Sequence, residues 1–92
     1  MNRPTENQIG DLLKCIGKRV RERRMTLGLT RHELSDLSGV SLRYLAQLEK
    51  GDGNISVGRL FGISRALDLP MMDLLQTGNS IANQEERFSA LF

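Results

Sequence analysis

Two short helices separated by a very tight turn are the feature that most restricts how this chain can fold. Thr30 and Glu33 have the spacing of a capping box, in which each side chain bonds a free backbone amide of the other residue. A helix that begins there ends at Gly39, and Ser41 is a good N-cap for the next one. Gly51 ends this second helix. Residues 30–51 therefore predict a helix-turn-helix.

The segments on both sides of this motif are also expected to be helical. A helix from about residue 8 to 27 has an apolar stripe with steps of three, four and seven, made of Ile9, Leu12, Leu13, Ile16, Val20 and Leu27. Gly17 lies within it, and we expect this glycine to permit the close approach of another helix. Ser56 predicts the start of a fourth helix, and Pro70 suits the first turn of a short fifth helix through Leu75.

A core can be assigned from the same periodicity. The residues expected to face inward from the three central helices are Leu34, Leu37, Leu45, Leu48, Val57, Leu60, Ile63 and Leu67. The sequence thus predicts an all-α fold, a compact five-helix domain over residues 8–76. Residues 77–92 are predicted to be a linker or a tail that contacts a partner or a second copy, through Ile81, Phe88, Leu91 and Phe92.

The charge is unevenly distributed along the chain, although the net charge is only +2. Residues 14–65 contain eleven Lys and Arg against five Asp and Glu, whereas residues 66–92 contain one Arg and four acidic residues. A basic body with an acidic tail suits a nucleic-acid-binding protein, and charge alone fits a solvated helix face equally well.

Several classes of protein are disfavoured by the composition. The single cysteine, Cys15, excludes an internal disulfide, and no Cys/His cluster is spaced to hold zinc. No apolar run resembles a signal peptide or a membrane span, so we expect a cytoplasmic protein. We expect no cofactor and no enzymatic activity, because no nucleophile is paired with a base and no phosphate-cradling loop is present.

The motif resembles a known family. Leu29-Thr30-Arg31-His32-Glu33-Leu34, Gly39-Val40-Ser41, Tyr44-Leu45 and Leu48-Glu49-Lys50-Gly51 are similar to the Cro-type, lambda-repressor-like (XRE) helix-turn-helix family. The similarity continues from Asn54 to Pro70 and covers residues 15–76. It implies a lambda-repressor-like fold and a transcriptional regulator that binds a double-stranded DNA operator. Such a regulator is expected to act as a homodimer on a (pseudo)palindromic site.

The second helix of the motif, residues 42–50, is the one that this family places in the major groove. If Leu45 and Leu48 face inward, the opposite face presents Ser41, Leu42, Arg43 and Gln47. Arg43 can bridge guanine O6 and N7, Gln47 can pair with adenine, and Leu42 can touch a thymine methyl group. The alternative is that these are merely solvent-exposed helix positions, and for Leu42 the two interpretations are nearly even.

Phosphate contacts are expected from helix N-termini and nearby polar or basic residues. The predicted residues are Arg31, Tyr44, Lys50, Asn54, Ser56, Arg19 and Arg23. Arg31 stands where relatives often carry Gln, and Asn54 and Ser56 flank the start of the fourth helix. The Tyr44 ring can instead pack against the turn with its hydroxyl on the backbone. His32 is expected on the surface, and the Ser35 hydroxyl needs a hydrogen-bond partner.

Two further hypotheses concern partners. Residues 41–49, with Gly51, Gly53, Asn54 and Ser56, are similar to aromatic-degradation regulators that respond to benzoyl-CoA, which implies an effector domain or ligand outside this chain. In the alternative, the chain is an antitoxin or other protein-interaction module whose tail binds a partner protein.

Overall fold

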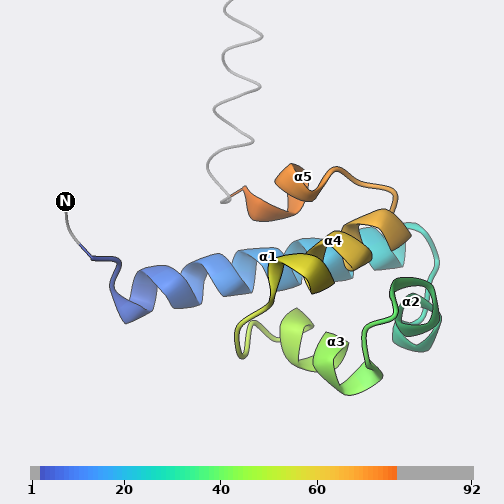
Figure 1. Ribbon diagram of the computed structural model, residues 1–92, viewed down its shortest axis with the longest axis horizontal. Coiled ribbons are helices and arrows are strands. Elements are labelled where there is room, and N and C mark those ends of the chain that lie inside the picture. The colour runs from blue at the N-terminus through green and yellow to red at the C-terminus, as the bar shows by residue number, and fades with distance from the viewer. Residues whose placement is uncertain (1–2, 77–92) are drawn as a thin grey trace, which may run out of the picture.

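The computed structural model describes residues 3–76, and this part of the chain forms five helices with no strand. They are α1 (Glu6–Thr26), α2 (Arg31–Ser38), α3 (Leu42–Glu49), α4 (Val57–Ala66) and α5 (Met71–Leu75). The long α1 packs against α3 and α5, whereas α2 packs against α3 and α4 (Figure 1). The predicted all-α, five-helix fold is confirmed, and the predicted tail 77–92 lies outside the described residues.

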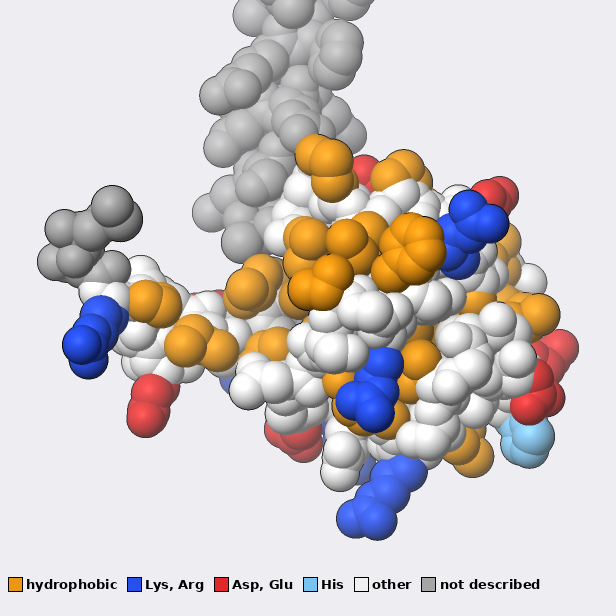
Figure 2. All heavy atoms as spheres, viewed as in Figure 1, with side chains coloured by type: hydrophobic (Ala, Val, Ile, Leu, Met, Phe, Trp, Pro, Cys, Tyr) orange, Lys and Arg blue, Asp and Glu red, His pale blue; other side chains and the backbone are white. Residues whose placement is uncertain are grey.

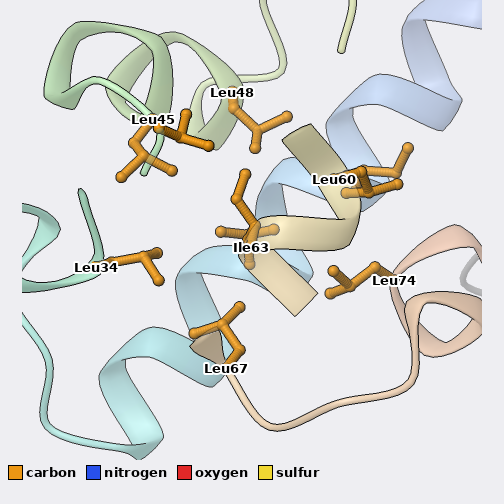
Figure 3. Close-up of a cluster of buried hydrophobic side chains, with 10 residues drawn as sticks. Leu34, Leu45, Leu48, Leu60, Ile63, Leu67 and Leu74 are labelled. Atoms are coloured by element: carbon orange, nitrogen blue, oxygen red, sulfur yellow. The ribbon is translucent and has the colours of Figure 1, made fainter. Parts of the chain in front are cut away.

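A single cluster of apolar side chains joins the five helices. Leu34 of α2 and Leu45 and Leu48 of α3 point toward Ile63, and Leu60, Leu67 and Leu74 close the cluster from the other side (Figure 3). Each of these side chains is buried, as are Ile16 and Val20 of α1. Helices this short are marginal in water, so their stability comes from packing this shared apolar face.

Each of the first four helices begins at a hydroxyl side chain that accepts a hydrogen bond from a backbone amide. The predicted caps Thr30, Ser41 and Ser56 are confirmed, and Thr30 forms the complete capping box with Glu33. Helix α1 begins at Glu6, two residues before the predicted start, because Thr5 and Gln8 form a second capping box. The prediction missed this box although its spacing is the same as that of Thr30 and Glu33.

Some predicted core residues are in fact exposed. Leu37 in α2 is 61% exposed and Val57 in α4 is 71% exposed, so their assignment to the core was wrong. Helix α2 lies at the edge of the bundle, where α3 and α4 cover only its Leu34 side, and Val57 occupies the first turn of α4, before that helix enters the core. The apolar stripe of α1 was also predicted too long, because Ile9, Leu12 and Leu27 are exposed.

Helices α1 and α3 come together at Gly17. A Cβ atom added at this position would collide with the backbone carbonyl oxygen of Leu48. The close approach expected at this glycine is therefore confirmed, and the partner helix is α3. Since the collision is with backbone rather than with a flexible side chain, one of the two helices would have to move to accommodate it.

We predict that Gly17→Ala lowers the free energy of unfolding by about 1–3 kcal/mol, the usual cost of overpacking. The matched control is Gly10→Ala in the same helix, where an added Cβ meets no atom within 4 Å. It should stabilise the protein by about 0.5–1 kcal/mol, because alanine favours the helix. Urea denaturation followed by circular dichroism measures both, and equal effects of the two substitutions would contradict the close contact.

Candidate nucleic-acid interface

Helix α3 has one buried face and one exposed face. Leu45 and Leu48 are buried, whereas the four residues predicted to read bases are all exposed: Ser41, Leu42, Arg43 and Gln47. The Ser41 hydroxyl accepts a hydrogen bond from the Tyr44 amide at 3.2 Å, which fixes the first turn of the helix. The structure thus brings these four side chains together at the surface of one two-turn helix.

The turn between α2 and α3 is fixed by backbone geometry and by two serines. Gly39 ends α2 with φ of 73°, a left-handed conformation that glycine adopts without the strain of a Cβ atom. The Ser35 hydroxyl donates to the Val40 carbonyl at 2.6 Å, and the Ser38 hydroxyl accepts from the Val40 amide at 3.2 Å. Ser35 therefore has the partner that its hydroxyl needed, and two serines of α2 hold Val40 in the turn.

A buried carboxylate attaches the end of α3 to the two helices before it. The side chain of Glu49 is 1% exposed and accepts two hydrogen bonds of 2.9 Å from the Nε and Nη2 atoms of Arg24 in α1. It also accepts one of 3.2 Å from Nε of Arg31 in α2. The hydrogen bonds between Arg24 and Glu49 are the main cause of the raised pKa of Arg24. Arg24 further donates to the Leu29 carbonyl at 2.8 Å, so the α1–α2 link joins the same network.

Arg31 has a second function available to it. Its side chain is 44% exposed, and within residues 3–76 its hydrogen bond to Glu49 uses only Nε. A guanidinium group carries five N–H donors, so the remaining donors face solvent at the start of α2. The predicted role of Arg31 at a phosphate remains available in this geometry.

Arg19 and Arg23 lie on another side of the molecule. Arg19 donates to the Asp73 carbonyl in α5, and Arg23 donates to the Leu67 carbonyl at the end of α4, each at 3.0 Å. Figure 1 shows α5 and α3 on opposite sides of α1. The structure therefore does not bring these two arginines to the exposed face of α3, and their phosphate contacts stay predictions.

The loop from residue 51 to 56 is tied to α3 through Tyr44. The Tyr44 hydroxyl donates to the Asn54 carbonyl at 2.8 Å, which is the backbone contact considered for this residue as an alternative to a phosphate. Lys50, Asn54 and Ser56 are exposed beside it, and the Ser56 hydroxyl accepts from the Arg59 amide at 3.2 Å. Figure 2 shows basic side chains on the surface formed by α3 and the start of α4.

Arg59, which lies beside α3, was not among the residues singled out from the sequence. The guanidinium carbon of Arg59 lies 4.8 Å from the centre of the Tyr44 ring, so the side chain stacks on a residue of α3. An arginine in the first turn after the Ser56 cap was a visible signal, because that helix start was already predicted to hold phosphate. Its contact with Tyr44 could not be read from the sequence.

The single histidine and the single cysteine have ordinary surroundings. His32 is exposed as expected, and its Nδ1 atom lies 3.5 Å from Oδ2 of Asp36, which is also exposed. Cys15 is half-buried in α1. Among residues 3–76, no group of three His, Cys, Asp or Glu side chains is arranged to hold a metal ion. No helix in the same range has the length and hydropathy needed to cross a membrane.

A family model described as helix-turn-helix (HTH_3) matches residues 20–74, more than half of the chain. The chain belongs to the helix-turn-helix family. This match confirms the family predicted from residues 15–76. The resemblance to regulators that respond to benzoyl-CoA gains no support from it and stays a prediction.

Proteins similar to this chain are named as regulators. Transcriptional regulator ClgR of Mycobacterium tuberculosis is 39% identical over 73 residues, which are 78% of this chain and 65% of ClgR. The crystal structure of ClgR from Corynebacterium glutamicum is 31% identical with a TM-score of 0.69, over 87% of this chain and 86% of that one. The restriction-modification controller protein C.AhdI from Aeromonas hydrophila is 34% identical with a TM-score of 0.65, over 67% of this chain and 94% of C.AhdI.

Helix α2 provides a test of how the caps hold the motif. The pKa of Glu33 is lowered from 4.5 because its carboxylate accepts a hydrogen bond from the Thr30 backbone amide, with a further contribution from the Thr30 side chain. A lowered folded pKa means that this contribution to stability is present above about pH 4.5 and is lost as the pH falls through the folded value.

We predict that wild-type protein loses more thermal stability than Glu33→Gln between about pH 6 and about pH 3, because glutamine keeps the capping bond without titrating. The neutral box formed by Thr5 and Gln8 shows that glutamine fits this geometry. Melting temperatures across the pH series measure the difference. Parallel profiles for the two proteins would contradict a contribution from this carboxylate.

Proposed function

We propose that this chain binds double-stranded DNA in a sequence-specific manner and regulates transcription, with α3 in the major groove. The observation that carries the proposal is the division of α3 into a buried face and an exposed face that holds Ser41, Leu42, Arg43 and Gln47. An α-helix fits the major groove, where each base pair presents a distinct pattern of donors and acceptors. The names of the similar proteins, ClgR among them, support the same function.

The proposed contacts divide into two groups. Arg43 can donate to guanine O6 and N7, and Gln47 can donate to adenine N7 and accept from its N6 amino group. Leu42 offers an apolar contact to a thymine methyl group. Arg31, Lys50, Asn54 and Ser56 are proposed to bind phosphates and to set the orientation of α3, a task that carries no sequence information. The anchoring of Arg31 on Glu49 at 3.2 Å supports this assignment, because it restricts the side chain before DNA binds.

We also propose that the protein binds its operator as a homodimer. Figure 2 shows a cluster of hydrophobic side chains over α5 and the neighbouring part of α4. The exposed apolar residues of these two helices include Phe61, Met72 and Leu75. An operator that matches a two-fold dimer has half-sites about 34 Å apart along the DNA, one for each copy of α3.

A regulator that binds chromosomal DNA works in the cytoplasm, and we infer that location for this chain. The effector domain or ligand expected from the sequence stays a prediction, and the chain spans 65% of the M. tuberculosis relative. An antitoxin whose tail masks a partner is the competing function, and its predicted contacts fall on residues outside 3–76.

Selection of binding sites from random DNA tests the function, and two substitutions test the contacts. Arg43→Ala should relax the base preference at one position of the selected site, because it removes a bidentate base contact. Arg31→Ala should weaken binding to all sequences alike and reduce the slope of log K against log salt by about 1. Fluorescence anisotropy titrations over a salt series measure both effects.

Wild-type protein that selects no sequence would refute the proposed function. If DNA is bound but both variants keep full affinity and base preference, the docking of α3 is wrong while DNA binding stands. Circular dichroism of Arg31→Ala is the control, because this substitution also removes an ion pair with buried Glu49.

The dimer can be tested with two exposed methionines. Met72 of α5 is 72% exposed and Met25 at the end of α1 is also exposed. Met72→Glu should shift the sedimentation equilibrium toward the monomer, because a charge would be placed in the proposed interface. Met25→Glu should leave the equilibrium unchanged. A wild-type protein that stays monomeric at high concentration and binds a single half-site would contradict the dimer.

A further inference from the structure

Within residues 3–76, the Arg59 side chain lies over the Tyr44 ring and takes part in no ion pair. Its guanidinium group lies 4.8 Å from the centre of the Tyr44 ring, which is cation–π distance. The ion pairs within residues 3–76 join Lys18, Arg24 and Arg31 to glutamates, and none of them includes Arg59. Stacking uses the flat face of a guanidinium group, and its N–H donors all lie in the plane at the edge. The hydrogen-bonding edge of Arg59 is therefore available.

Three contacts hold this arginine in place. The Tyr44 ring is itself fixed, because its hydroxyl donates to the Asn54 carbonyl at 2.8 Å. The Arg59 amide donates to the Ser56 hydroxyl at 3.2 Å, which fixes the backbone from which the side chain extends. The ring then restricts the side chain from the α3 side. An arginine that is ordered before binding loses less conformational entropy when a ligand arrives.

The position of this pair relates it to DNA. Tyr44 follows Arg43 in α3, so the ring under Arg59 belongs to the helix that carries the proposed base contacts. Asn54 and Ser56, which are proposed to bind phosphate, are the residues that hold the ring and the Arg59 backbone. Arg59 therefore lies where α4 meets the recognition surface, at the edge of the face that α3 presents.

We propose that Arg59 binds a DNA phosphate and that Tyr44 is the residue that positions it. A planar, edge-on guanidinium group matches the oxygen atoms of a phosphodiester, which it can bind through two parallel hydrogen bonds. Tyr44 acts through Arg59 rather than by touching phosphate with its own hydroxyl. This inference rests on the proposed function and adds a contact from α4 to those of α2 and α3.

The test compares Arg59→Met with Arg65→Met, which removes the same charge from the same helix. Arg65 is also exposed, and six residues place it about 120° away from Arg59 around the helix axis. Binding is measured by fluorescence anisotropy on the duplex that wild-type protein selects, from about 50 to about 200 mM KCl. Arg59→Met should reduce the slope of log K against log salt by about 0.9 per subunit, and Arg65→Met should leave it close to wild type.

Three more substitutions separate the effects of charge, side-chain geometry and folding. Arg59→Lys keeps the charge but not the planar edge, so it should keep the salt slope while binding more weakly than wild type. Tyr44→Leu should weaken binding in the wild-type background and have little effect in the Arg59→Met background, because a positioning residue acts only through its partner. Tyr44→Phe keeps the aromatic ring and should keep most of the salt slope. Of the Tyr44 variants, it is the one that changes the fold least.

The outcomes are distinct. Equal salt slopes for Arg59→Met and Arg65→Met would overturn this inference while leaving DNA binding by α3 intact. A change in base preference for Arg59→Met, instead of a uniform loss, would overturn the phosphate assignment. An equal effect of Tyr44→Leu in both backgrounds would overturn the positioning role. Failure of wild-type protein to bind any selected duplex would refute the proposed function itself.

Discussion

The orientation of α3 depends on one buried carboxylate. Glu49 is 1% exposed, and its two oxygens accept hydrogen bonds from arginines of both preceding helices. A buried carboxylate is costly to desolvate, and the hydrogen bonds from these two cations offset that cost. Together with the backbone approach at Gly17, it holds the C-terminal end of the two-turn α3 against α1. A helix too short to be stable alone becomes a rigid surface through these contacts.

The local features of the fold were predictable because they are set by residues close together in sequence. A capping box joins a side chain and an amide three residues apart, so Thr30 and Glu33 predict the start of α2 without any knowledge of tertiary structure. The same rule would have found Thr5 and Gln8. Burial is different, because it depends on which helices reach a given side chain. Leu37 and Val57 have the right periodicity, and yet no neighbouring helix covers them.

The candidate site was predictable in the same measure. Once Leu45 and Leu48 are assigned to the core, the helical repeat leaves Ser41, Leu42, Arg43 and Gln47 on the outer face. The contacts that hold this face in place were not predictable, because they join distant parts of the chain. Arg24 and Glu49 are 25 residues apart, and Arg31 and Glu49 are 18 apart. Arginines that look alike in the sequence therefore have different surroundings, as Arg23 and Arg59 do.

If α3 binds in the major groove as proposed, its shortness limits the number of base pairs that one copy can contact. Eight residues make a helix about 12 Å long, which spans roughly four base pairs at about 3.4 Å each. A given sequence of four base pairs occurs about once in every 256 positions of random DNA, whereas a genome offers roughly 10⁶ or more competing sites. One such surface alone therefore cannot distinguish a single operator from the rest of a genome. The proposed homodimer would recognise two such sites at a fixed spacing, and the stiffness of the DNA between them would then contribute to specificity.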